Sequence, residues 1–142
     1  MIAGYSGTPL SRKLGITTGV RVGTFGAPPS FADLLDPLPT GAKLVRSPRA
    51  PCPVLVVFAT TSAELESRFT RAVGLLASDA GLWVAWPKKT SRVETEIDFD
   101  AVQTLGLAAG LVDNKVAAID ATWSGLRFVV RTKDRQGWSG PS

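Results

Sequence analysis

The sequence has no histidine and only one cysteine among its 142 residues. Without histidine it cannot build a Ser-His-Asp or Cys-His catalytic arrangement, nor a histidine-ligated metal site. With one cysteine it cannot form an internal disulfide or a cluster of thiolate ligands. Catalysis would have to use carboxylates, lysines, Tyr5, hydroxyls, backbone groups or a borrowed cofactor. The sequence therefore predicts no metal site.

Long apolar runs are also missing. None approaches the ~20 residues needed to span a bilayer. The first residues, MIAGYSGTPLSRKLG, lack the basic start and long apolar stretch of a signal peptide. These absences predict a soluble cytoplasmic protein with no membrane partner. The lone Cys52 lies between Pro51 and Pro53, and we expect it to be a buried thiol with no chemical role.

The amino-acid composition is that of an ordinary globular domain. Apolar residues make up 44% of the chain, charged residues 20%, and the net charge is +4. We expect a single domain over residues 1–131. Residues 132–142 are rich in Gly and Ser without apolar periodicity, which predicts a disordered tail. The modest basic excess is compatible with an anionic partner, but it is far from the signature of a nucleic-acid-binding protein.

Helical signals are clearest in the middle of the chain. Thr61 and Glu64 have the spacing of a capping box, and apolar residues then repeat with a period of 3.6 as far as Leu76. Arg68 and Arg71 fall on the other faces of this helix, where we expect them to be solvated.

Two further helices and six strands are expected. Ser30, with Asp33 three positions later, has the pattern of an N-cap for a short helix. Another helix begins near Asp98 and ends before Gly110. Strand-like runs are expected at residues 20–25, 42–46, 54–60, 82–86, 114–120 and 126–132.

This alternation defines the fold class. Strands that alternate with helices predict a mostly parallel sheet with helices on both faces. The turn around ATWSG is too short for a parallel crossover, so the last two strands must be antiparallel. The prediction is an α/β, Rossmann-like three-layer sandwich whose mostly parallel sheet includes an antiparallel final strand.

The stretch GLWVAWPKKTSR, residues 81–92, shows where a site would lie in such a sheet. Its continuous apolar run is typical of a central strand covered on both faces. Pro87 lacks a backbone donor and ends the strand. Lys88 and Lys89 then emerge at the strand's carboxyl end, which is the edge where open α/β sheets bind ligands.

Two resemblances follow from these residues. The pieces YSGTPLSRKLG, LWVAWPKK and DNKVAAIDATWSGLRFVVR resemble a family of small, uncharacterised bacterial proteins, largely actinobacterial, that carries no established activity. The match runs from about residue 4 to residue 131. The expected architecture is similar to the class I, S-adenosylmethionine-dependent methyltransferase fold, shortened by one helix-strand unit.

The sequence departs from the methyltransferase motifs at both diagnostic contacts. The family has a Gly-rich loop after its first strand, whereas TFGAPPSF offers Gly26 alone and loses two backbone donors to Pro28 and Pro29. The family also has an acidic residue at the end of its second strand to hold the ribose hydroxyls. Arg46 takes that position here. We therefore predict no bound cofactor.

The carboxyl ends of the strands supply the candidate ligand-binding residues. They are Gly26, Arg46, Thr60, Trp86, Lys88, Lys89, Asp120 and Trp123, with Arg49 and Arg92 adding to a basic rim. The amide-rich helix starts after Ser30 and Thr61 would assist in binding a phosphate, nucleotide or other anion.

Each candidate also has a structural alternative. The basic residues would bind an anion or, as we favour, are simply solvated in loops, since no phosphate-loop signature is present. Trp86 and Trp123 would stack on a ligand ring or, as we favour, pack at the rim of the core. Asp120 would act as a base, form an Asx-type turn or pair with Lys88. The YSGTPL segment around Tyr5 is either a lid or a structural cap.

We favour a binding or regulatory module without catalysis, with an anionic small molecule as partner. One alternative is an atypical small enzyme, S-adenosylmethionine-dependent or otherwise, with Lys88, Asp120 or Tyr5 as acid-base groups. The other is a nucleic-acid-binding protein, which the modest charge disfavours. The ligand's identity and the oligomeric state do not follow from the sequence.

Overall fold

The structure is a computed structural model that describes residues 8–140. Tyr5 and the first half of the YSGTPL segment, residues 5–7, lie outside the described residues. The elements are α1 (Leu10–Lys13), β1 (Arg21–Phe25), α2 (Ser30–Leu34), β2 (Lys43–Arg46), β3 (Val54–Phe58), α3 (Ser62–Val73), β4 (Gly81–Pro87), η1 (Lys89–Ser91), α4 (Phe99–Ala108), β5 (Leu111–Ala118), β6 (Trp123–Val130) and η2 (Thr132–Gly137).

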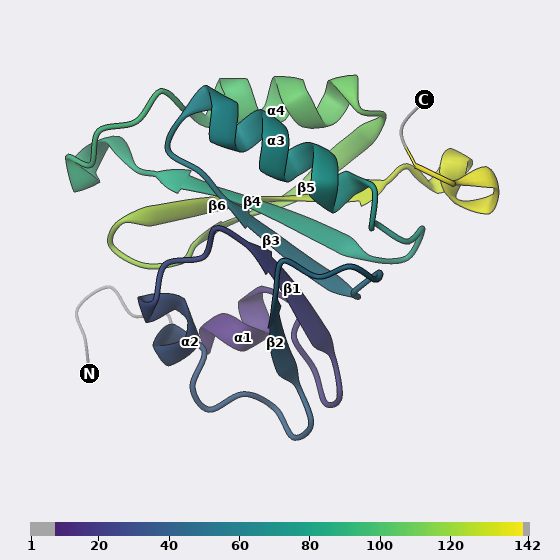
Figure 1. Ribbon diagram of the computed structural model, residues 1–142, viewed down its shortest axis with the longest axis horizontal. Coiled ribbons are helices and arrows are strands. Elements are labelled where there is room, and N and C mark those ends of the chain that lie inside the picture. The colour runs from purple at the N-terminus through teal and green to yellow at the C-terminus, as the bar shows by residue number, and fades with distance from the viewer. Residues whose placement is uncertain (1–7, 141–142) are drawn as a thin grey trace.

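The strands form one six-stranded sheet with the order β2-β1-β3-β4-β6-β5. The pairs among β2, β1, β3 and β4 are parallel, whereas β6 is antiparallel to both of its neighbours. Helices α3 and α4 cover one face of the sheet, and the short helices α1 and α2 lie on the other (Figure 1). The predicted three-layer α/β architecture, with its antiparallel final strand, is confirmed.

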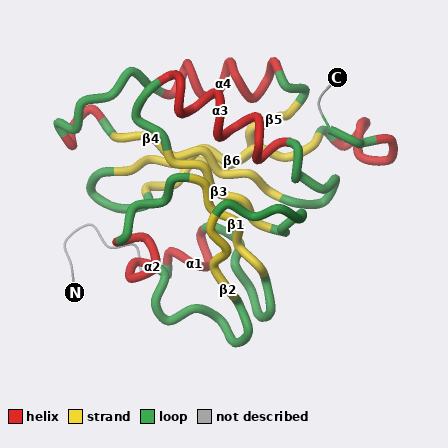
Figure 2. The backbone as a smooth tube through the Cα atoms, in the orientation of Figure 1, coloured by secondary structure: helices red, strands yellow, loops and turns green. Residues whose placement is uncertain are grey.

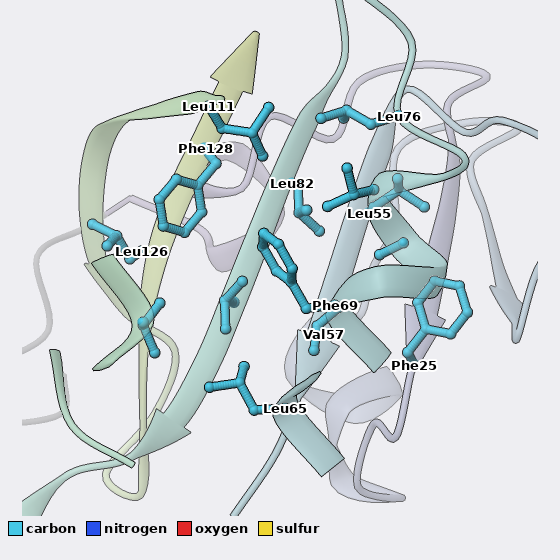
Figure 3. Packing of buried hydrophobic residues seen from close by; sticks show 14 of the residues in the cluster. Phe25, Leu55, Val57, Leu65, Phe69, Leu76, Leu82, Leu111, Leu126 and Phe128 are labelled. Atoms are coloured by element: carbon cyan, nitrogen blue, oxygen red, sulfur yellow. The ribbon is translucent and has the colours of Figure 1, made fainter. Parts of the chain in front are cut away.

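The sheet separates two apolar cores. On the α3 and α4 side, Phe69 of α3 packs edge-on against Phe128 of β6, with 6.3 Å between ring centroids. Figure 3 shows Phe69 among apolar side chains from β3, β4 and β6. On the α1 and α2 side, Phe31 packs edge-on against Phe58 at 4.9 Å. Cores on both faces explain why β3 and β4 are apolar at every position.

Strand β4 is buried along its whole length, as its sequence predicts. Trp83 is 0% exposed, and its indole Nε1 donates to the Leu14 carbonyl oxygen at 3.1 Å, so the polar atom in this core is satisfied. Pro87 is the last residue of the strand and lies opposite Trp123 of β6.

The predicted helix caps have mixed outcomes. Thr61 and Glu64 form the predicted capping box at the start of α3, and Asp98 accepts from the Ala101 N–H at the start of α4. Ser30 is not an N-cap, which corrects the expectation. The helix begins at Ser30 itself, and the preceding Pro29 makes no side-chain capping bond.

A loop takes the place of a helix over β1. Residues 47–53 lead from β2 across β1 to β3 without forming a helix. A Cβ atom on Gly23 would lie 2.5 Å from Pro48 Cγ and 3.2 Å from Cys52 Sγ, so this connector sits directly on the strand. Cys52 is buried, as expected, and burial raises the pKa of its thiol. Side chains of this connector, rather than a helix, thus pack against β1 at Gly23.

The segment after β6 differs from the disorder that its composition predicts. Residues 132–137 form η2, and Trp138 then donates from its indole Nε1 to the Leu76 carbonyl oxygen at 2.8 Å. The Arg135 side chain donates to the Val130 carbonyl oxygen at 3.1 Å. The contact of Trp138 with Leu76 anchors this segment to the domain. Composition alone does not reveal such a contact.

Candidate functional site

Strands β2, β1, β3 and β4 lie side by side in the sheet (Figure 2) and are parallel, so their carboxyl ends gather at one edge. In the sheet, β2 lies on one side of β1 and β3 lies on its other side. The direction in which the chain adds strands therefore reverses between β1 and β3. Open α/β sheets bind ligands in the crevice at such a reversal. We therefore expect the candidate site to lie around the carboxyl ends of β1, β2 and β3.

A pocket of about 330 Å³ lies at this edge, between the ends of β1 and β2 and the helix α2. Its lining residues are Thr24, Ala27, Pro28, Pro29, Phe31, Ala32, Leu44 and Arg46. Arg46 is the only charged residue among them. The pocket thus offers a largely apolar wall with one cation at its margin.

Arg46 and Thr24 supply the polar groups of the pocket. They lie opposite each other in the parallel pairing of β1 and β2, so their side chains share the α2 face of the sheet. Thr24 is 3% exposed, whereas Arg46 is exposed. Within the described part of the chain, Arg46 makes no ion pair or side-chain hydrogen bond. Its guanidinium is therefore available to an external anion.

The crevice between β1 and β3 holds a protein side chain. Arg68 of α3 reaches over the sheet edge, and its Nη1 donates to the Phe58 carbonyl oxygen at 2.7 Å. Gly26 has a positive φ of 75°, and a Cβ atom there would overlap the Arg68 guanidinium. Arg68 is thus partly buried and hydrogen-bonded at this edge of the sheet, rather than the solvated charge that the sequence predicts. Its position depends on where α3 crosses the sheet, which the helical pattern does not specify.

The predicted anion site at the start of α3 is occupied by the protein's own carboxylates. Glu64 Oε1 accepts from the Thr60 and Thr61 backbone N–H groups at 3.0 and 3.3 Å. Glu96 Oε1 accepts from the Ser62 N–H at 2.7 Å. The backbone hydrogen bond from Thr60 is the main reason why the pKa of Glu64 lies below its ordinary value. Thr60, a predicted ligand residue, therefore serves this internal network.

The end of β4 lies apart from the pocket. Two strands separate β4 from β2, so Lys88 and Arg46 are roughly 14 Å apart by strand spacing alone. The Lys88 N–H donates to the Thr122 carbonyl oxygen at 2.8 Å, and Lys89 is exposed in η1. The predicted basic rim is therefore divided rather than brought together. Arg49 and Arg92 are exposed and do not line the pocket.

The remaining candidates make contacts within the protein. Trp86 is 7% exposed and packs edge-on against Phe99 at 6.2 Å. Trp123 packs in the same manner against Phe58 at 5.1 Å. Asp120 Oδ1 accepts from the Thr122 and Trp123 N–H groups at 2.8 and 2.7 Å, which is the Asx-type turn that leads into β6.

Comparisons with known proteins give the fold and no family. No family model matches the sequence, and no curated protein is significantly similar to it. TrmN from Thermus thermophilus superposes on 86% of this chain and on 47% of its own length, with a TM-score of 0.53 and 11% identity. LepI in complex with SAM covers 87% of this chain and 47% of its own length, with a TM-score of 0.48 and 11% identity.

The chain spans about half the length of these structures. Together with the strand order, the match to TrmN shows a shortened version of the class I methyltransferase-like fold. At 11% identity the likeness extends to the fold alone. No helix among the described residues is long and apolar enough to cross a membrane. In the same residues, no group of three or more potential ligands is placed to hold a metal ion.

The residues present do not fit S-adenosylmethionine, the cofactor that this fold implies. Arg68 fills the space beside Gly26, where the family's glycine-rich loop admits the cofactor. At the end of β2, the exposed Arg46 stands where the family has a carboxylate for the ribose hydroxyls. Pro28 and Pro29, which line the pocket, lack backbone N–H groups.

Proposed function

We propose that the chain is a non-catalytic binding or regulatory module for an anionic small molecule. The ligand would occupy the pocket between the ends of β1 and β2 and α2. One observation carries the proposal: Arg46 is the only charged side chain among the described residues that line this pocket, and none of those residues pairs with it. A cation left free beside an apolar wall is suited to a ligand that brings its own negative charge.

The lining specifies the ligand's chemistry further. Phe31, Leu44 and the two prolines favour an apolar or ring-shaped body. The guanidinium of Arg46 presents paired donors that match a carboxylate or a phosphate group. At about 330 Å³, the pocket has the size of a site for a small metabolite. The expected ligand is therefore a small carboxylate or phosphate ester with an apolar part.

A thermal-shift screen tests the proposal. Phosphorylated metabolites, nucleotides and small carboxylates would be added to the purified protein, and affinities of positive compounds would be measured by calorimetry. Arg46→Ala should weaken binding by at least about tenfold, because it removes a charge-assisted hydrogen-bonding partner. Arg49→Ala is the matched control, since Arg49 is exposed and does not line the pocket. Equal affinities in both variants would exclude the pocket as the site.

The same screen separates the alternative functions. It would include S-adenosylmethionine, and stabilisation by this compound together with methyl transfer to any substrate would overturn the non-catalytic proposal. The Lys88→Ala, Lys89→Ala double variant would test the other half of the predicted basic rim. If this double variant loses anion binding and Arg46→Ala keeps it, the ligand lies at the end of β4 instead.

A further inference from the structure

A second basic feature lies at the opposite edge of the sheet, beside the outermost strand β5. A cavity of about 490 Å³ separates β5 from the short helix α1, and its walls include Arg12, Lys13 and Lys115. None of the described residues that line it carries a carboxylate. Within the described part of the chain, none of the three cations makes an ion pair or a side-chain hydrogen bond. The groove between α1 and β5 therefore carries uncompensated positive charge.

Strand β5 itself has an open edge along this groove. It pairs only with β6, so its outward backbone N–H and C=O groups have no strand partner among the described residues. Residues 114–116 are exposed, and Val116 is 64% exposed. An exposed strand edge beside a polar groove is the arrangement that accepts an added strand from another chain.

We infer that the β5 edge binds an extended acidic segment of a partner protein by strand addition. The partner's backbone would pair with β5, and its carboxylates would meet Arg12, Lys13 and Lys115. This inference goes beyond the proposed small-molecule pocket and does not depend on it, because the two features lie at opposite edges of the sheet.

The pairing of β5 specifies the sequence pattern of the partner. Lys115 lies opposite Arg127 of β6, on the face that carries α1, whereas Val116 lies opposite Leu126, on the face that carries α4. A strand added to β5 would direct alternate side chains to the same two faces. The partner segment should therefore alternate acidic residues, on the α1 face, with apolar residues that cover Val116.

The charges argue against two other occupants. A second copy of this chain, paired through β5, would bring a second basic edge to a groove that already carries Arg12, Lys13 and Lys115, and like charges close together repel. A single-stranded nucleic acid would need aromatic side chains on which its bases could stack, and none of the described residues that line this groove is aromatic. An acidic polypeptide satisfies both the charge and the free backbone edge.

Fluorescence polarisation with labelled short peptides tests this inference at low salt. The probes would alternate glutamate with valine, leucine or phenylalanine. Lys115→Glu should weaken binding by about tenfold, because it removes an attraction and adds a repulsion. Lys43→Glu is the matched control, since Lys43 is exposed on β2, the opposite edge strand, and gives the same change in net charge. Both lysines are exposed, so both variants should fold normally.

A second probe separates strand pairing from simple charge attraction. Methylation of alternate backbone nitrogens of the peptide should abolish binding, because it removes the donors that would pair with β5. Binding that survives this methylation, or that falls equally in Lys115→Glu and Lys43→Glu, would overturn the inference. So would the absence of binding by every acidic probe. An oligothymidine that binds more tightly than the peptides and is sensitive to Lys115→Glu would identify a nucleic-acid surface instead.

Discussion

Arg68 and Gly26 occupy adjoining space at the crevice between β1 and β3, and a Cβ atom on Gly26 would overlap the guanidinium. Gly26 also has a φ of 75°, where a side chain strains the backbone. Gly26→Ala should therefore destabilise the protein by more than the roughly 1–2 kcal/mol expected from the backbone alone. Denaturant unfolding gives the free-energy change directly.

Two variants isolate the part of that loss that comes from Arg68. In an Arg68→Ala background, Gly26→Ala should reduce the free energy of unfolding only by the cost of the strained backbone. Gly110→Ala provides the reference for that component, because Gly110 has a φ of 87° and no heavy atom within 4 Å of a Cβ placed there. If the Gly26 and Arg68 changes prove additive, the two residues do not compete for space in solution.

Replacing Gly106 with alanine should have the opposite effect to the one usual for a glycine within a helix. Replacing a helical glycine with alanine ordinarily stabilises the helix by about 1 kcal/mol. A Cβ atom on Gly106 of α4, however, would overlap the buried ring of Phe128. Gly106→Ala should instead destabilise the protein by about 1–3 kcal/mol through overpacking. Gly74→Ala is the control, because its Cβ would meet no atom closer than 3.5 Å and should be tolerated.

The capping network of α3 should make stability depend on pH. The pKa of Glu64 is lowered in the folded protein, mainly by the backbone hydrogen bond from Thr60. The ionised form therefore contributes stability that is fully present above the ordinary glutamate pKa of about 4.3 and is lost as the pH falls through the lower folded value. Glu64→Gln should be less stable at neutral pH and lose less stability on acidification. If the free energy of unfolding changed with pH in the same way for the wild type and Glu64→Gln, this assignment would be contradicted.

Trp138 should stabilise the domain although it lies outside the predicted boundary at residue 131. Its indole donates to the Leu76 carbonyl oxygen, and its ring packs against the core beneath α3. Trp138→Ala should destabilise the protein by about 1–3 kcal/mol through lost burial and a lost hydrogen bond. Gln136→Ala, an exposed change in η2, should have little effect. Equal thermal midpoints for both variants would show that the contact contributes nothing.

Several elements that follow from local sequence were predicted correctly, although the N-cap expected at Ser30 was wrong. The capping box at Thr61, the cap at Asp98 and the buried strand β4 depend on neighbouring residues alone, and the structure contains all of them. The docking of Trp138 and the path of the connector over Gly23 depend on contacts between distant segments. No periodicity or local motif encodes such contacts.

The candidate site was predictable only as an edge of the sheet. The sequence identifies strand ends, and it correctly places Arg46, Thr60 and Lys88 at the same edge. It does not give the distance between strands, so it groups Arg46 with Lys88 although two strands lie between them. Thr24 was missed because a threonine inside a strand carries no signal that it faces a pocket.

The position of β4 has a consequence for the chain while it is being synthesised. One neighbour of β4 is β3, which precedes it, but its other neighbour is β6, which leaves the ribosome only after α4 and β5. Until then the strand LWVAW presents an open, apolar edge, which is the kind of segment that aggregates. Pro87, Lys88 and Lys89 flank that strand as gatekeepers, since proline and clustered charge oppose intermolecular strand pairing. Lys88→Ala with Lys89→Ala should therefore lower the soluble yield during expression and leave the thermal midpoint of the folded protein almost unchanged, and an unaltered yield would refute this role.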